Sequence, residues 1–393
     1  MHKILTFNHI SVKGLEQLSR EHYEVASELG HPDAILLRSH KLTAPDIADS
    51  IKAIARAGAG TNNVPVDWCT EHGIPVFNTP GANANAVKEL VLAALLLGSR
   101  GILEGIDYVR GLTEQQDAVE LSKLLEQEKK RFKGEELVGK KLGVVGLGAI
   151  GSSVAEAALT LGMEVLGYDP ALSVDAAWRL PSDVQRMDNL VSLVGKADYI
   201  TLHLPVLDST RHLVNAELLA QCKPEARLLN FARDEIVDTE AIVAALDAGR
   251  IGRYLTDFPD PNLIHREDVV LMPHIGASTT EAEENCAIMA ARQLRDFLEN
   301  GNIKHSVNFP TLALERNGGY RLAISNNNVP KILGNILSIL ADQNINVIDM
   351  LNKSRDEIAY NLIDIGTEAG QATIDALCAV DGVINVRTIA ASC

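Results

Sequence analysis

The sequence predicts an α/β fold made of two Rossmann-like, doubly wound parallel-sheet domains and a small βαββαβ domain at the C-terminal end. Three observations lead to this prediction. Strand-like and helical segments alternate over residues 3–77 and again over 142–257, a glycine-rich turn follows the first strand of the second series, and charged residues with paired glycines interrupt the pattern at 315–319. With 393 residues, the chain is long enough for two or three domains of ordinary size.

The first series contains four short apolar strands separated by polar or helical stretches, the order typical of a parallel sheet. These strands are expected at residues 3–7, 34–37, 54–56 and 76–77, followed by an apolar helix over 86–99 and a charged helix over 112–131. The apolar helix is more hydrophobic than one exposed face requires, which favours a subunit contact and a homodimer, with a homotetramer as the alternative. The charged helix is either an arm for a partner subunit or a plain surface helix.

The second series contains five strands, expected at residues 142–145, 164–168, 199–204, 227–231 and 254–257, and a helix over 280–300 then returns to the first domain. Beyond the break, strands at 321–324, 347–352, 358–365 and 383–389 alternate with helices at 330–343 and 370–380 in a ferredoxin-like βαββαβ order. The predicted domains are therefore residues 1–85 with 283–316, residues 86–282, and residues 317–393.

Composition and charge exclude several classes of protein. A net charge of −16 opposes binding to phosphate backbones and anionic lipids, and the basic residues within 129–133 follow acidic ones, as on a solvated helix face. We therefore expect no nucleic-acid and no membrane partner. The longest apolar run, residues 90–97, is too short for a bilayer, and no signal sequence is seen. The cysteines are scattered and lack metal-ligand spacing, which predicts no metal site and a cytoplasmic location; they are Cys69, Cys222, Cys286, Cys378 and Cys393.

The glycine-rich turn predicts a dinucleotide site. Gly146-Leu147-Gly148-Ala149-Ile150-Gly151 follows an apolar strand and opens a helix, so the three glycines allow a tight turn, a close approach of the pyrophosphate, and packing of helix on strand. Asp169 ends the next strand, where a carboxylate accepts hydrogen bonds from the hydroxyls of the adenosine ribose. Because that charge repels a 2′-phosphate, the sequence predicts NAD rather than NADP.

An arginine and a histidine at later strand ends suit hydride transfer from a hydroxy acid. This chemistry needs a base for the hydroxyl proton and a cation for the carboxylate and the forming carbonyl. Arg233 ends the apolar segment at 228–232, and His274 follows the segment at 271–273. Either residue alone would more often be structural, as a surface ion pair or a packed histidine. In combination they favour a dehydrogenase site at the carboxyl edge of the sheet.

The order of these segments resembles that in the D-isomer-specific 2-hydroxyacid dehydrogenase family, and the resemblance covers residues 1 to about 310. Two further stretches match the family: Arg56-Ala57-Gly58-Ala59-Gly60-Thr61-Asn62-Asn63-Val64 and Pro80-Gly81-Ala82-Asn83-Ala84-Asn85. The resemblance implies that Arg233 binds the carboxylate and reacting oxygen and that His274 takes the hydroxyl proton. It implies further cofactor contacts at Leu204, Pro205, Phe231, Ala232, Asp257, Gly276 and Ala277, with Asp257 at the nicotinamide half. It places substrate groups at Ala59, Gly60 and Asn83, with the phosphate at Arg38 or Arg56.

One departure from the family concerns the partner of His274. Members carry a Glu that pairs with the catalytic His, but here the stretch over residues 256–262 is two residues shorter and lacks it. Asp260 is the nearest replacement and is our predicted catalytic partner, with Glu267 and Asp268 as further candidates. A smaller departure is Asp234, where many relatives have Gly.

Residues 320–393 resemble an ACT domain, a module that binds amino acids in biosynthetic enzymes. By that resemblance Asn326, Asn328 and Asn346 are candidate ligands for L-serine, because amides hold both the ammonium and the carboxylate of a zwitterion. Lys331 stands where the pattern usually has Gly, so binding or domain pairing is open to change. The alternative is that these Asn residues serve only as helix caps and turn formers.

Three functions are compatible with these residues. The ACT-like tail favours the members of the family that oxidise 3-phosphoglycerate, the first step of L-serine biosynthesis. A reductase of glyoxylate or hydroxypyruvate is the related alternative, although such relatives usually lack the tail. An NAD-sensing binding protein on the same fold is the alternative from a different class, encouraged only by the missing Glu.

Overall fold

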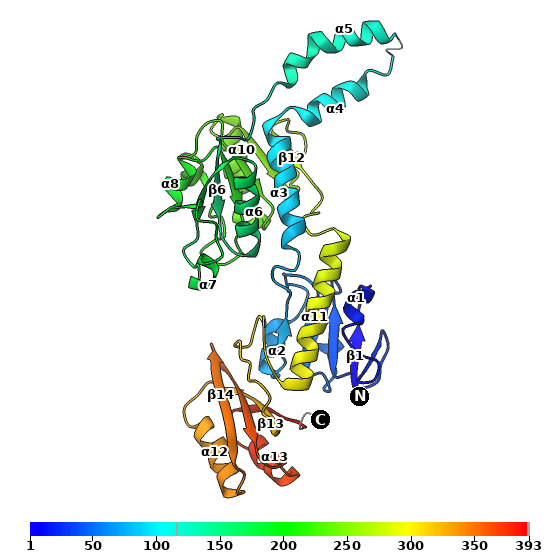
Figure 1. Ribbon diagram of the computed structural model, residues 1–393, viewed down its shortest axis with the longest axis vertical. Coiled ribbons are helices and arrows are strands. Elements are labelled where there is room, and N and C mark those ends of the chain that lie inside the picture. The colour runs from blue at the N-terminus through cyan, green and yellow to red at the C-terminus, as the bar shows by residue number, and fades with distance from the viewer. Residues whose placement is uncertain (115–116, 391–393) are drawn as a thin grey trace. The chain divides into compact units, whose positions relative to one another are not determined.

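The structure is a computed structural model that describes residues 1–114 and 117–390, so Cys393 lies outside the described residues (Figure 1). The chain divides into two compact units. The first comprises Met1–Asn83 and Thr279–Cys393, and the second comprises Ala84–Ser278. The first unit is therefore discontinuous in sequence, and it includes the C-terminal residues that we expected as a separate domain.

The first unit contains a five-stranded parallel sheet in the order β2-β1-β3-β4-β5. Its strands are β1 (His2–Thr6), β2 (Tyr23–Ala26), β3 (Ala34–Leu37), β4 (Ala53–Arg56) and β5 (Val76–Phe77). All four residues of β3 are buried, as expected for a central parallel strand covered on both faces. The helical elements beside it are α1 (Val12–Leu15), η1 (Ala44–Asp46), α2 (Val66–Glu71) and α11 (Thr280–Asn300).

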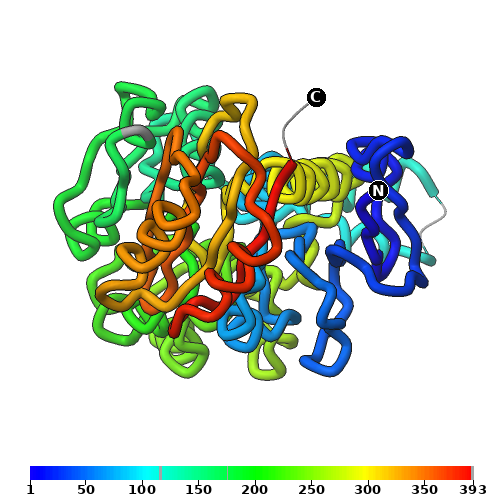
Figure 2. Tube along the Cα trace, turned by 90° about the horizontal axis from the view of Figure 1, so that it is seen from below, coloured from blue at the N-terminus to red at the C-terminus, as the bar shows by residue number. Residues whose placement is uncertain are grey.

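Helix α11 joins the C-terminal part of the chain to this sheet. It begins where the Thr279 side chain accepts a hydrogen bond from the Ala282 N–H, and it ends at Gly301 in the left-handed conformation. Its buried face is rich in alanine and packs against α1, β3 and β4, which places the yellow helix beside the blue segments in Figures 1 and 2. The return of this helix to the first sheet agrees with the sequence pattern.

The C-terminal residues form a four-stranded antiparallel sheet in the order β14-β15-β13-β16, with two helices. These elements are β13 (Tyr320–Asn327), α12 (Ile332–Asp342), β14 (Val347–Arg355), β15 (Ile358–Ile365), α13 (Gln371–Cys378) and β16 (Val383–Ile389), which is the predicted βαββαβ order. Leu322, Ile324 and Ile363 pack with the two helices, whereas Ala323 and Leu362 share a hydrophobic core with residues of the first sheet. The shared core explains why this module belongs to the first unit.

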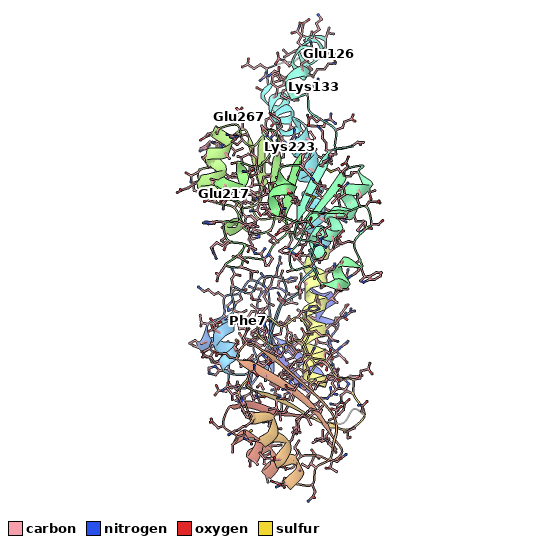
Figure 3. The ribbon with its side chains drawn as sticks, turned by 90° about the vertical axis from the view of Figure 1, so that its left-hand side faces the viewer. Phe7, Glu126, Lys133, Glu217, Lys223 and Glu267 are labelled. Carbon is pink, nitrogen blue, oxygen red and sulfur yellow. The ribbon has the colours of Figure 1, made fainter. Side chains whose placement is uncertain are left out.

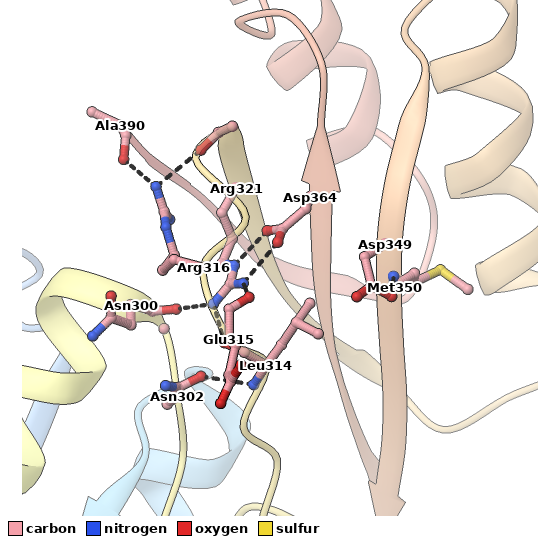
Figure 4. Close-up of polar contacts among 12 residues, drawn as sticks. Asn300, Asn302, Leu314, Glu315, Arg316, Arg321, Asp349, Met350, Asp364 and Ala390 are labelled. Carbon is pink, nitrogen blue, oxygen red and sulfur yellow. Dashed lines mark hydrogen bonds and ion pairs between the residues drawn. The ribbon is translucent and has the colours of Figure 1, made fainter. Parts of the chain in front are cut away.

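A fully buried arginine reinforces that junction (Figure 4). Arg321 pairs with the carboxylate of Asp364 through Nε at 2.6 Å and Nη2 at 2.8 Å. Its Nη1 donates to the carbonyl oxygens of Asn300 and Leu314, and its Nη2 also donates to that of Glu315. Because a buried charge is costly unless it is paired and hydrogen-bonded, this complete set of partners is what makes an arginine tolerable there.

The second unit contains a seven-stranded parallel sheet in the order β12-β11-β10-β9-β6-β7-β8. Its strands are β6 (Lys141–Val145), β7 (Glu164–Tyr168), β8 (Gln185–Arg186), β9 (Tyr199–Leu202), β10 (Arg227–Asn230), β11 (Arg253–Thr256) and β12 (Val269–Leu271). The structure adds β8 and β12 at the two edges of the five expected strands. Both residues of β8 are polar and exposed, so the hydrophobic pattern gave no signal for it.

Helices of the second unit cover this sheet and extend beyond it. They are α3 (Ala84–Ser99), α4 (Ile102–Gly111), α5 (Ala118–Glu128), η2 (Lys129–Phe132), α6 (Ala149–Thr160), α7 (Val174–Ala177), α8 (Leu190–Val194), α9 (Ala216–Leu219), η3 (Asp234–Ile236) and α10 (Thr239–Asp247). Helix α3 packs against α6 and shares a core with the sheet. Its apolar character is thus largely explained within the unit, and it does not by itself require the subunit contact that we expected.

Helices α4 and α5 form a helical hairpin beyond the end of α3 (Figure 1). Lys129 pairs with Glu126, and Arg131 pairs with Glu128, at the C-terminal end of this hairpin, where Figure 3 labels Glu126 and Lys133. These pairs agree with the prediction of a solvated charged face. Val109 and Val119 are more than half exposed on the same hairpin.

Candidate active site

The glycine-rich turn between β6 and α6 leaves open space at its middle glycine. Gly146 has a φ of 91°, and a Cβ there would lie 2.5 Å from a backbone carbonyl oxygen of the neighbouring loop. A Cβ on Gly151 would overlap the carbonyl oxygen of Gly146, whereas a Cβ on Gly148 would meet no atom within 4 Å. Gly148 is the N-cap of α6, so Ala149 and Ile150 lie in the first turn, where backbone N–H groups lack helical partners. The turn therefore fits a pyrophosphate group.

Asp169, directly after β7, is held against this turn. Its Oδ2 accepts a hydrogen bond of 2.9 Å from the Leu147 N–H, and its Oδ1 accepts one of 2.9 Å from the Ala171 N–H. A carboxylate oxygen accepts more than one hydrogen bond, so both oxygens retain capacity for ribose hydroxyls. The position fits the predicted role of Asp169.

Other predicted cofactor residues follow strands at the same carboxyl edge. Leu204 and Pro205 come after β9, and Phe231 and Ala232 come after β10, which is the neighbour of β9 in the sheet. Phe231 and Ala232 are buried, Leu204 is half-buried and Pro205 is exposed. The parallel order of the strands thus collects the predicted cofactor residues along one edge.

Asp257, directly after β11, carries a buried carboxylate with one unpaired oxygen. Its residue is 1% exposed. The Oδ2 atom accepts a hydrogen bond of 2.9 Å from the Gly276 N–H, whereas Oδ1 has no partner among the described residues. Burial raises the pKa of this carboxyl above its usual range. A buried acceptor without a donor fits a ligand that supplies one, such as the carboxamide of a nicotinamide ring.

His274 is an exposed residue held in an unusual backbone conformation. Its φ is 47°, and its N–H donates to the carbonyl oxygens of Asp257 at 2.8 Å and Met272 at 3.1 Å. Its ring lies 4.9 Å from that of Phe258. A non-glycine residue in the left-handed region costs free energy, and such strain is concentrated at functional sites. The loop that carries Gly276 and Ala277 follows directly.

Arg233 presents a half-buried guanidinium at the end of the neighbouring strand β10. Its Nη1 donates to the carbonyl oxygen of Ala232 at 2.6 Å, and it forms no ion pair within the described residues. Asn230, which is fully buried, fixes this loop by donating to the Arg233 carbonyl oxygen at 2.8 Å and accepting from the Ala232 N–H at 3.2 Å. Our sequence reasoning missed Asn230, although a polar residue within an apolar strand was a usable signal.

The three candidate partners of His274 do not reach it. Asp260 is half-buried, and its Oδ1 accepts hydrogen bonds from the N–H and the Nδ2 of Asn262, at 2.8 and 2.9 Å. Asp268 is paired with Arg266, and Glu267, labelled in Figure 3, is exposed. No carboxylate of the described chain is hydrogen-bonded to the His274 ring. The catalytic role of Asp260 therefore stays a prediction without support from this geometry.

Two arginines end adjacent strands of the first unit. Leu37 of β3 pairs with Arg56 of β4, so Arg38 and Arg56 lie at the same carboxyl edge. The Arg56 Nε donates to the Arg38 carbonyl oxygen at 3.0 Å, and the Arg38 Nη2 lies 2.7 Å from a carboxylate oxygen of Glu283. A Cβ on Gly58 would overlap the Arg56 guanidinium, so only glycine leaves room for it. Glu283 was not among our predicted residues.

The other predicted substrate residues lie in the loops of the same unit. The carbonyl oxygen of Ala59 accepts a hydrogen bond of 2.6 Å from Asn78 Nδ2, and Gly60 follows as a half-buried residue. The Asn83 side-chain oxygen is buried and has no partner among the described residues. It is a free acceptor of the kind that a bound ligand satisfies.

Comparison with known proteins identifies a family for this chain. Residues 104–276 match the D-isomer specific 2-hydroxyacid dehydrogenase, NAD binding domain. A D-3-phosphoglycerate dehydrogenase of Haemophilus influenzae is 34% identical over 90% of this chain and 85% of that protein. The chain belongs to the D-isomer specific 2-hydroxyacid dehydrogenase family. The predictions of family and of an NAD-binding domain are confirmed.

Two further members show how far the likeness extends. The D-3-phosphoglycerate dehydrogenase of Methanocaldococcus jannaschii is 32% identical over 84% of this chain, but the chain spans only 61% of that relative's length. The structure of a 3-phosphoglycerate dehydrogenase of Entamoeba histolytica with bound NAD+ has a TM-score of 0.62 and 26% identity, covering 79% of this chain and 99% of that one. The fold class predicted for this 2-hydroxyacid dehydrogenase family member is therefore confirmed.

The candidate effector residues of this 2-hydroxyacid dehydrogenase family member lie at opposite ends of its C-terminal sheet. Asn326 is buried, and its oxygen accepts from Asn361 Nδ2 at 2.7 Å; Asn328 is exposed beyond the end of β13. Asn346 precedes β14, whose Val347 pairs with the far end of β15. One chain therefore does not bring the three side chains together. Lys331, in place of the usual Gly, adopts a φ of 78°.

Neither a metal cluster nor a membrane-spanning helix is found in the described part of the chain. Among residues 1–114 and 117–390, no three His, Cys, Asp or Glu side chains gather so that they could hold a metal ion. Within the same residues, every helix is too short or too polar to cross a membrane.

Proposed function

We propose that this protein uses NAD to oxidise 3-phosphoglycerate to 3-phosphohydroxypyruvate, the first step of L-serine biosynthesis. The observation that carries the proposal is the set Arg233, Asp257 and His274, which follow three neighbouring strands, β10, β11 and β12, at one sheet edge. A cation without an ion pair, a buried acid with a free acceptor and an accessible imidazole are the groups that hydroxy-acid oxidation requires. The names of the three relatives and the neighbouring arginines at positions 38 and 56 support a phosphorylated substrate.

Most of these residues have binding roles, and one of them transfers a proton. We assign Arg233 to the substrate carboxylate and the reacting oxygen, because a guanidinium binds planar oxygen pairs and stabilises developing negative charge. His274 takes the proton of the hydroxyl group as the C–H bond breaks. When bound, NAD+ would supply the hydride acceptor. Asp257 holds the nicotinamide half through its unpaired oxygen, and the carboxylate of Asp169 selects NAD over NADP. Arg38 and Arg56 take the phosphate.

Initial rates test this proposal directly. NADH formation is measured with NAD and a panel of 2-hydroxy acids that includes 3-phosphoglycerate and its unphosphorylated analogue glycerate, at alkaline pH because the oxidation releases a proton. We expect 3-phosphoglycerate to have the highest kcat/KM. Inactivity across the whole panel would remove the enzyme assignment and favour an NAD-sensing protein.

A second candidate is a reductase of glyoxylate or hydroxypyruvate. The ion pair between Arg38 and Glu283 favours it, because a carboxylate already occupies one of the two cations proposed for the phosphate. The same panel, run with NADH and the 2-oxo acids, distinguishes the two. A higher kcat/KM for glyoxylate than for 3-phosphohydroxypyruvate would select the reductase.

We propose L-serine as an effector and two copies of the chain as its site. Asn326 and Asn328 lie at one end of the sheet and Asn346 at the other, so an antiparallel pair of modules would bring unlike ends together. The edge strand β14 is largely exposed and free to pair. L-serine should raise the thermal stability of the parent but not of Asn346→Ala, with D-serine as the control. No serine effect on activity or stability would leave these residues as caps and turn formers.

The oligomer that we propose is a homodimer or a homotetramer. The exposed apolar residues of the α4–α5 hairpin and of β14 are candidate contacts. Light scattering over a range of protein concentrations would give the mass, and a monomer at every concentration would contradict the assignment. A cytoplasmic location remains a prediction from cysteine usage.

A further inference from the structure

Glu283 opposes one of the arginines assigned to the substrate phosphate. The Glu283 carboxylate lies in the first turn of α11, where the helix N-terminus stabilises negative charge. It reaches the Arg38 Nη2 at 2.7 Å, and each side chain is 40% exposed. The pair is therefore partly open to solvent, at the carboxyl edge of the first sheet.

The backbone on the arginine side of this pair is fixed. The carbonyl oxygen of Arg38 accepts hydrogen bonds from Arg56 Nε at 3.0 Å and from Asn63 Nδ2 at 3.1 Å. The Arg38 guanidinium itself has only Glu283 as an ion-pair partner in the described chain. Any anion that binds Arg38 must therefore displace Glu283 or share the cation with it.

The energies decide between these outcomes. An exposed ion pair contributes about 0.2–1 kcal/mol, so a phosphate dianion that binds the planar guanidinium through two oxygens displaces the carboxylate. The displaced carboxylate remains on α11, within the range at which like charges repel. A substrate without a phosphate does not meet this repulsion. The carboxylate thus acts on one class of substrate only.

We infer that Glu283 is a specificity-determining residue that acts through Arg38 and weakens the binding of phosphorylated 2-hydroxy acids relative to unphosphorylated ones. This inference rests on the proposed function, because it requires Arg38 to hold the phosphate. Glu283 touches no reacting atom, so its effect belongs to KM and not to kcat.

The test compares Glu283→Gln with a matched control on the same helix turn. Glu284→Gln removes one charge from the adjacent position, but its carboxylate pairs with Lys13 at 2.7 Å and not with Arg38. In Glu283→Gln we expect the KM for 3-phosphoglycerate to fall about three- to tenfold, with kcat within about twofold and the KM for glycerate unchanged. Glu284→Gln should leave the ratio of the two KM values unchanged.

A double-mutant cycle and a binding measurement complete the test. In the background of Arg38→Gln, the gain from Glu283→Gln should disappear, because the residues act through one contact. An unchanged or raised KM for 3-phosphoglycerate in Glu283→Gln would overturn the inference, a rise meaning that Glu283 orients Arg38 for the substrate.

Calorimetric titration with inorganic phosphate at constant ionic strength gives a readout that needs no turnover. If the parent oxidises no phosphorylated substrate, the proposed function fails, yet tighter phosphate binding by Glu283→Gln still supports the role of Glu283. Equal phosphate affinities of the parent and Glu283→Gln would refute that role even in an enzyme that oxidises 3-phosphoglycerate.

Discussion

Each of the two parallel sheets carries polar groups at its own carboxyl edge, but the two sheets hold these groups in different ways. After β7 and β11 of the second unit, Asp169 and Asp257 are fixed by hydrogen bonds from backbone N–H groups, and Asp257 is buried. After β3 of the first unit, the Arg38 guanidinium is held, within the described part of the chain, only by an exposed ion pair. At the edge of the second unit, the carboxylates assigned to the cofactor are thus rigidly held, whereas at the edge of the first unit a cation assigned to substrate choice is weakly held and open to exchange.

The largest effect that would test the rigid edge is expected at His274. Replacement by Gln keeps a polar side chain of similar reach but removes the base, so kcat should fall by about 10²- to 10⁴-fold. The KM for NAD should change little. Steady-state rates with saturating NAD measure this.

A matched control for His274→Gln is His265→Gln, an exposed histidine of the same unit that we assign no role. It should keep the parent rate. A loss of less than about threefold in His274→Gln would remove the assignment of the base.

Asp169 tests whether the anchoring of the glycine turn matters for NAD. In Asp169→Ala the carboxylate that accepts from Leu147 and Ala171 is lost together with the acceptor for the ribose. NAD affinity should fall by about tenfold, the effect of losing one or two hydrogen bonds to a charged group, and discrimination against NADP should relax.

Fluorescence titration with NADH and NADPH measures both effects of Asp169→Ala. The control is Asp188→Ala, an exposed aspartate near the edge strand β8 whose weak pair with Arg186 is almost fully exposed. An unchanged affinity for NADH in Asp169→Ala would refute the assignment.

The features on which these predictions depend could not all be predicted from the sequence. The glycine turn and the strand ends could be predicted, because apolar runs and glycine spacing are local patterns. The pairs Arg38–Glu283 and Arg321–Asp364 could not, because each joins residues far apart in the chain through folding alone. What covers the apolar helix α3 could not be predicted either, because hydrophobicity does not say whether the covering residues belong to the same unit, as they largely do here, or to another subunit.

The free energy of unfolding of an Asp257 variant tests how the buried carboxylate affects the stability of the second unit. Burial raises the pKa of the Asp257 carboxyl in the folded protein. The protein therefore keeps its full free energy of unfolding at low pH, where the carboxyl is neutral, and loses part of it as the pH rises through the folded-state pKa. Asp257→Asn removes that loss, and the free energy of unfolding should rise by about 1 kcal/mol at pH 8, a shift of about 2–4 °C in Tm. NAD binding should weaken in the same variant.

The pH dependence of Tm distinguishes this cause from others. The difference between Asp257→Asn and the parent should shrink as the pH falls through about 4 toward about 3, where the parent carboxyl is largely protonated in both states. A variant that is less stable than the parent by the same amount at pH 8 and pH 4 would mean that the unpaired oxygen does not destabilise the fold.

The smallest effect is expected at Asp260, the residue that we predicted from sequence to support His274. Its carboxylate accepts two hydrogen bonds from Asn262, so it behaves as a turn-forming residue in this loop. Asp260→Asn keeps an oxygen that accepts the same bonds, and kcat should change by less than about threefold, with the pH profile of kcat/KM unmoved. A downward shift of the pKa that governs the acidic limb of the profile would instead show that the carboxylate swings to His274 when substrate binds. In that case the loop after β11 would be weakly held, like the Arg38 side chain. At the carboxyl edge of the second unit's sheet, only Asp169 and Asp257 would then count as rigidly held.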